Sequence, residues 1–186
     1  AVVDVWRLTR NPEARDFCAT RGWFTASKWW TCALIFSAVI ISVPPINALI
    51  HGTYVVAGHA MAAMIGIDTM ILIGAIIWIL GEHLQAREGA SGAVSLNTTE
   101  MRRILIGLNL SVAALVVWLH VVGVAVSVTR ASHAPNEAYV PPDWVTAFSG
   151  LGFAISGTIT LAFFVLLLVK LHPPAFRYFW VSPTRV

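Results

Sequence analysis

Three residues that can bind metals, His51, His59 and Met61, lie at the start of an apolar segment. Histidine is costly inside a membrane span and usually faces the interior of a helix bundle, so it marks a ligand or proton site. Neutral imidazole binds haem iron, and a thioether can also do so. The first chemistry to consider for His51, His59 and Met61 is therefore the ligation of haem iron.

His59 and Met61 are two residues apart, which places them on nearly opposite faces of a helix. One helix could therefore present a ligand to each of two cofactors; the alternatives are a His59 hydrogen bond to a neighbouring helix and ordinary packing of Met61. Asp68 follows seven residues later, on the face of Met61. Its carboxyl group must be protonated, paired or placed in a wet cavity. Both a proton relay and a hydrogen bond that locks two helices fit Asp68.

Two further histidines could approach the same region. His51 precedes the second span, where with Thr53 it could cap the start of the helix instead of binding a cofactor. His120 lies in the third span, and the depths of His59 and His120 differ by only about 6 Å at 1.5 Å per residue. The two imidazoles could share one haem, or His120 could hydrogen-bond to a carbonyl group or to a propionate group of a cofactor.

The composition is that of a membrane protein. The chain has 186 residues, of which 58% are hydrophobic and 11% are charged, and its mean hydropathy is +0.77. Soluble domains carry about 25% charged residues. The net charge of +3 indicates no nucleic-acid partner, and Cys18 and Cys32 lack the spacing of a metal knuckle or of covalent haem attachment.

We expect an all-α integral membrane protein with four transmembrane helices. Each apolar run is near the roughly 20 residues that a bilayer requires, and a span in lipid must be helical because lipid offers the backbone no partners. The expected spans are about 26–49, 53–81, 101–129 and 144–171. They form one domain over 26–172, between a basic segment at 1–25 and a tail at 173–186.

Lysine and arginine residues cluster before the first span, between the second and third spans, and after the fourth. The positive-inside rule then predicts both termini and the 82–100 loop on the cytoplasmic side. Trp29, Trp30 and Trp78 fit an inner aromatic belt, and Trp144 fits an outer one.

Small and polar residues indicate how the helices pack. Gly58, Ala62 and Gly66 recur every four residues, which allows a close helix approach and would also leave room for a flat macrocycle. Asn109 and Ser111 are predicted to make polar contacts between helices.

The run His51-Gly52-Thr53, followed by Ala57 and His59, resembles the tenth helix of the haem-copper oxidase superfamily, and most of all its nitric oxide reductase branch. The resemblance implies that His59 is the proximal ligand of a high-spin, b-type haem. The four spans resemble the ninth to twelfth helices, so most of the chain resembles the C-terminal third of a catalytic subunit. A bacterial inner membrane is the location that the resemblance implies.

The chain departs from this family at Met61, where the family has a second histidine that binds a low-spin haem. Either Met61 ligates that haem, or the haem is absent or held elsewhere. The family takes its non-haem metal ligands from earlier helices. The resemblance therefore implies a larger membrane subunit that supplies these helices and holds any non-haem metal.

Three hypotheses follow. In the first, the chain and its partner form an oxidoreductase that reduces NO or O₂ with electrons from a cytochrome c or a quinol; His59 binds haem and Asp68 relays protons. In the second, His59 and His120 clamp one haem in a four-helix b-type cytochrome that anchors a dehydrogenase. In the third, the chain is a haem-free accessory subunit of a membrane complex.

Overall fold

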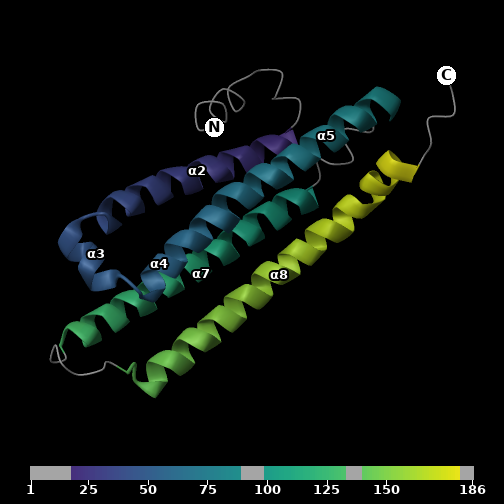
Figure 1. Ribbon diagram of the computed structural model, residues 1–186. Helices are drawn as coiled ribbons and strands as arrows, with labels where there is room; N and C mark the ends of the chain where they lie inside the picture. The colour runs from purple at the N-terminus through teal and green to yellow at the C-terminus, as the bar shows by residue number, and fades with distance from the viewer. Residues whose placement is uncertain (1–17, 89–98, 133–139, 181–186) are drawn as a thin grey trace.

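The computed structural model describes residues 18–88, 99–132 and 140–180. Within these ranges every regular element is helical, and the helices form four spans that lie side by side (Figure 1). All four are long and apolar enough to cross a membrane, which confirms the predicted all-α fold. The start of α2 (Cys18–Ile41) and the end of α8 (Asp143–Trp180) lie at the same end of the bundle (Figure 1).

The first span differs from the expected range of 26–49. Helix α2 begins earlier and ends at Ile41, and a separate short helix, α3 (Pro44–Ile50), follows. Proline has no backbone N–H and disfavours helix in the residue before it. Val43 is accordingly extended, with φ −67° and ψ 120°, and the two prolines begin the new helix, where a missing N–H costs no hydrogen bond.

The second span is continuous but not uniform. It consists of α4 (Tyr54–Met61), the π-helix η2 (Ala62–Thr69) and α5 (Met70–Glu88). Within η2, the hydroxyl group of Thr69 donates to the carbonyl oxygen of Met64, five residues earlier, at 2.9 Å. A π-helical stretch changes the rotation of the helix, and such stretches are frequent at functional sites. The side chains after η2 therefore face directions that a regular α-helix would not give them.

Helix α7 (Thr99–Ala131) lies at the centre and packs against α2, α4 and α8. Its predicted range was 101–129, and α8 continues through the two prolines beyond the predicted end at 171. The basic segment predicted at 1–25 is described only from Cys18, and the tail at 173–186 only to Trp180. One apolar cluster fills the end of the bundle where α2 begins: Trp23, Met70, Ile73, Ile77, Leu80, Leu84, Met101, Ile104, Leu108, Val112, Leu167 and Leu171.

The small-residue face of the second span packs against other helices. Gly58, Ala62 and Gly66 are all buried. A Cβ atom on Gly66 would lie only 2.5 Å from Cδ2 of Trp30, so the indole ring rests directly on this glycine. Trp30 is therefore a half-buried residue that joins two spans.

Candidate functional site

His59 of the second span and His120 of the third span line the same cavity. It has a volume of about 290 Å³, near the lower end of the ~300–1,000 Å³ of typical ligand pockets. Its walls come from α2, α4, η2 and α7. The lining residues are Trp30, Ala33, Leu34, Ser37, His59, Ala62, Val116, Val117, His120 and Val121. Because Ala33, Val117 and Val121 are exposed, the cavity opens toward the lipid-facing surface.

A serine on the first span orients the imidazole of His59. The Ser37 hydroxyl group donates to the carbonyl oxygen of Leu34 at 2.9 Å, which uses its only proton. The same oxygen lies 2.9 Å from Nδ1 of His59, so we assign Nδ1–H as the donor of that hydrogen bond. The lone pair of a neutral His59 is then on Nε2. Hydrogen bonding at one ring nitrogen fixes which nitrogen can bind a metal, and iron-ligating histidines are held in this way.

His120 has the same tautomer for a similar reason. Its Nδ1 lies 2.7 Å from the carbonyl oxygen of Val116, which can only accept, so Nδ1 donates and Nε2 carries the lone pair. The predicted bond of His120 to a carbonyl group is therefore present, and it leaves Nε2 available. Gly58 makes room for the ring, since a Cβ atom there would lie 2.7 Å from Nδ1 and 2.9 Å from Cε1 of His120.

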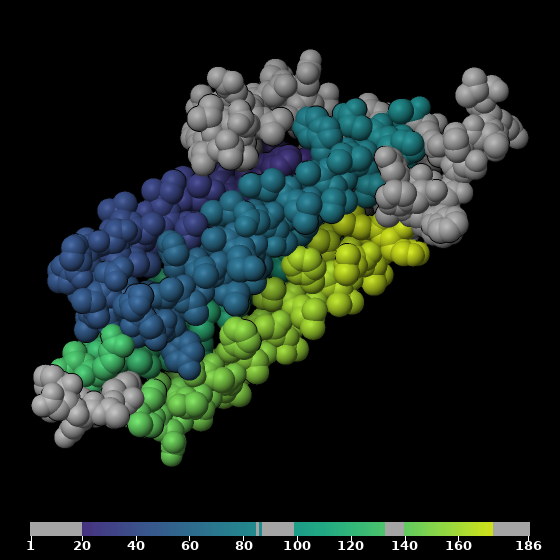
Figure 2. Space-filling view, viewed as in Figure 1, coloured from purple at the N-terminus to yellow at the C-terminus, as the bar shows by residue number. Residues whose placement is uncertain are grey.

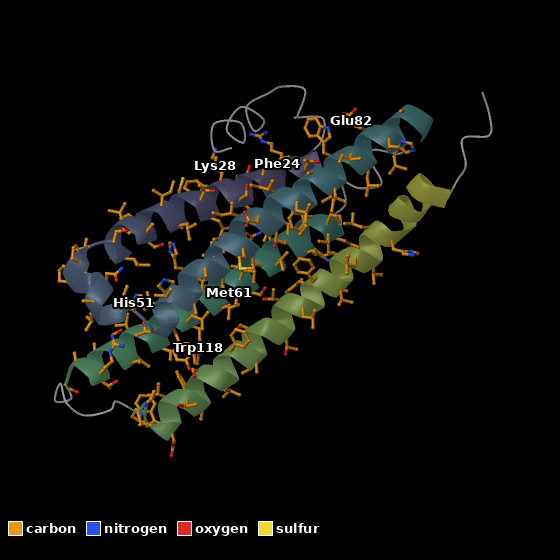
Figure 3. All side chains as sticks on the ribbon, viewed as in Figure 1. Phe24, Lys28, His51, Met61, Glu82 and Trp118 are labelled. Carbon is orange, nitrogen blue, oxygen red and sulfur yellow. The ribbon has the colours of Figure 1, made fainter. Side chains whose placement is uncertain are left out.

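The other three predicted site residues lie outside this cavity. Figure 3 shows His51 at the α3 end of the bundle and Met61 further along the second span. His51 is exposed, Met61 is half-buried, and neither lines the cavity. Asp68 is exposed, and it forms no hydrogen bond or ion pair with any residue that the structure describes. Its predicted helix-locking hydrogen bond is thus not made inside this part of the chain.

The run from His51 to Thr53 serves to reverse the chain between α3 and α4. Gly52 has a φ of +74°, a left-handed conformation that favours glycine. Thr53 caps α4, because its hydroxyl oxygen accepts from the backbone N–H of Val55 at 3.4 Å. Arg130 donates to the carbonyl oxygens of His51 at 3.2 Å and Leu49 at 2.8 Å, and so satisfies the end of α3. This run therefore has a structural role that is independent of any ligand.

A larger cavity adjoins the first. It measures about 520 Å³ and shares Trp30 and Ala33 with the histidine cavity. Asn109 anchors the shared wall, because its Oδ1 accepts from Nε1 of Trp30 at 2.9 Å, and its amide nitrogen donates to the carbonyl oxygen of Leu105 at 2.8 Å. The predicted interhelical contacts of Asn109 and Ser111 are both confirmed, since Ser111 accepts from Thr160 at 3.1 Å.

We expect Asn109→Leu to destabilise the bundle by about 1–2 kcal/mol, because the indole N–H of Trp30 would lose its acceptor in a half-buried position. The thermal unfolding midpoint of the purified protein in detergent would measure the loss. Thr158→Val is a suitable control, since the exposed Thr158 hydroxyl group donates only within its own helix, to Ala154 at 2.7 Å. Equal midpoints for the two variants would show that the Trp30–Asn109 bond does not hold α2 against α7.

His59 and His120 are the two histidines that line this cavity. In the ranges that the structure describes, no group of three or more His, Cys, Asp or Glu side chains is close enough to hold a metal ion. Haem needs only one or two axial ligands, because the macrocycle supplies the others. His59 and His120 both line the cavity, and in each ring the hydrogen bond is made by Nδ1.

Comparisons of the chain with models of protein families, with curated proteins and with solved structures find no match. The interpretation of this cavity therefore depends on the residues that line it.

Proposed function

We propose that this chain is a haem-binding membrane subunit of a respiratory redox complex, in which His59 ligates the iron through Nε2. The observation that supports this most directly is the Ser37–His59 hydrogen bond of 2.9 Å at a histidine that lines the cavity, because the tautomer that we assign from it leaves the lone pair on Nε2. Bound iron would supply electron transfer or the binding of a small gas. Ser37 would hold the imidazole ring in place, and Ala62 and Leu34 would keep the site apolar.

The proposal includes a partner, because a haem-copper oxidase-type reaction needs groups that the four spans do not contain. On the resemblance of His51-Gly52-Thr53 and His59 to the nitric oxide reductase branch, a larger membrane subunit supplies the remaining helices and any non-haem metal. The assembled enzyme reduces NO or O₂ with electrons from a cytochrome c or a quinol. We place it in the bacterial inner membrane with both termini in the cytoplasm. The assignment of Met61 to a second haem depends on the resemblance alone.

A b-type cytochrome is the second candidate, and one observation favours it. His59 and His120 line the same cavity, and both have Nδ1 engaged and Nε2 free. Two axial imidazoles would make a haem six-coordinate and suited to electron transfer instead of gas binding. In that case His120 is a ligand, whereas in the first proposal it is a neighbour of the site.

The His120→Ala variant separates the two candidates. If His59 is the only protein ligand, the wild-type complex binds CO, and His120→Ala retains the haem and the CO difference spectrum. If both histidines ligate, the wild type does not bind CO, and His120→Ala opens a coordination position that does. Reduced-minus-oxidised spectra of the purified complex, with and without CO, measure this. A wild-type complex with no haem signal from this chain would contradict both candidates and leave the haem-free accessory subunit.

A further inference from the structure

Asp68 is an exposed carboxyl group within the apolar part of the second span. Its level in the bundle follows from its neighbours, since Met70 contacts Asn109 and Gly58 contacts His120 on α7. Asp68 is therefore near the level of Ser111, which is eight residues or about 12 Å along α7 from Arg103. The aspartate side chain is too short to reach the membrane surface from that depth.

The residues around Asp68 form a continuous outer face. Ala60, Met64, Asp68, Leu72 and Ile76 recur every four residues and are all exposed. We call these five residues the Asp68 face. In Figure 2 the segment from α4 to α5 lies at the surface along most of its length, uncovered by another helix of this chain.

A charged group facing lipid is costly, and ionisable residues in membrane spans almost always face a bundle interior and pair with another group. Asp68 has no such partner among the described residues. The cations whose side chains the structure describes are mostly near span ends: Arg21, Arg102, Arg103, Arg130 and Lys170. Lys28 is closest in level to Asp68 but is already engaged in an interaction of its own. Among the side chains that the structure describes, a second copy of this chain therefore offers no other lysine or arginine near the level of Asp68.

We infer that the Asp68 face packs against a transmembrane helix of a different polypeptide, and that this helix places an arginine or lysine beside Asp68. The charge complementarity satisfies the carboxylate, and the small side chain of Ala60 on the same face allows the backbones to approach. The cavity of His59 and His120 is on the side of the span that packs against α2 and α7, so this inference does not depend on haem.

Site-specific photo-crosslinking in native membranes tests the inference. A photoreactive residue at Leu72, one turn from Asp68, is expected to crosslink to one other membrane polypeptide whose crosslinked helix contains an arginine or lysine. Leu168 on α8 is the matched control position, since its exposed fraction is 60% and that of Leu72 is 61%. The Leu72 crosslink is expected to fall about tenfold or more in Asp68→Asn and to persist in Asp68→Glu, because only glutamate keeps the charge.

Labelling with dicyclohexylcarbodiimide, which modifies protonated carboxyl groups in the membrane, gives a second readout. We expect Asp68 to be protected in the native complex and labelled once detergent has removed the partner. Three outcomes would overturn the inference: a Leu72 crosslink to a second copy of this chain, an Asp68→Asn variant that crosslinks as the wild type does, or equal labelling before and after dissociation. Each outcome is independent of the haem content, which the spectra above measure separately.

Discussion

A His59→Ala variant is expected to lose the haem absorbance assigned to this chain. The substitution removes the imidazole that lines the cavity and leaves a methyl group, which cannot bind iron. Haem per complex, measured as the pyridine haemochrome, should fall to the background set by the other subunits. His51→Ala is the matched control, because the exposed His51 side chain lies outside the cavity and should be replaceable without loss of haem.

Substitution of Ser37 is expected to lower the haem content partly, and a histidine with only a structural role would not show this partial loss. Removing a group that orients a metal-ligating histidine typically weakens metal binding by about 10–100-fold. Ser37→Ala should therefore retain haem more weakly than the wild type but better than His59→Ala. Ser42→Ala, just after the end of α2, provides the comparison, since the exposed Ser42 hydroxyl group donates to the carbonyl oxygen of Ala38 at 2.7 Å. Unchanged haem content in both His59→Ala and Ser37→Ala would make the Ser37–His59 bond a packing contact and move the search for haem ligands to other chains.

The four spans were predictable because the bilayer allows few backbone structures for an apolar run of this length. Apolar runs of the right length must be helical in a bilayer, and all four are helices in the structure. Polar residues inside those runs also predicted contacts between helices, because a polar side chain in a membrane span needs a hydrogen-bond partner. Asn109 and Ser111 do so across helices, to Trp30 and Thr160.

The contact of Ser37 with His59 and the π-helix η2 were not predictable from the spacing of residues along one helix. Ser37 is the only polar residue between Ala33 and Ile41, and that isolation was the available signal. Its importance depends on which face of α2 meets α4, which the sequence does not show. The π-helix η2 was also missed, because nothing in Ala62–Thr69 marks it in the sequence. Asp68 lies in this π-helix, so the face on which its side chain lies could not be predicted from the 100° per residue of a regular α-helix.

The closest backbone approach of α4 to α7 at a glycine is made at Gly123. A Cβ atom on Gly123 would overlap the backbone nitrogen of Val55 and approach the carbonyl carbon of Tyr54 within 2.9 Å. Backbone atoms cannot rotate away as a side chain can, so the two helices must move apart. We expect Gly123→Ala to destabilise the protein by about 3 kcal/mol, the upper part of the usual range for overpacking.

Gly157 supplies the control for that prediction, because a Cβ atom placed there would meet no packing neighbour within 4 Å outside its own stretch of helix. Alanine favours helix over glycine by up to about 1 kcal/mol, so Gly157→Ala should be neutral or stabilising. Unfolding midpoints in detergent would compare the two, and equal midpoints would mean that the close approach at Gly123 is not maintained. Because Gly123 is one turn from His120 and Val55 is one turn from His59, the same shift should separate the two imidazoles. Gly123→Ala is therefore expected to lower haem content as well, without altering any residue that lines the cavity.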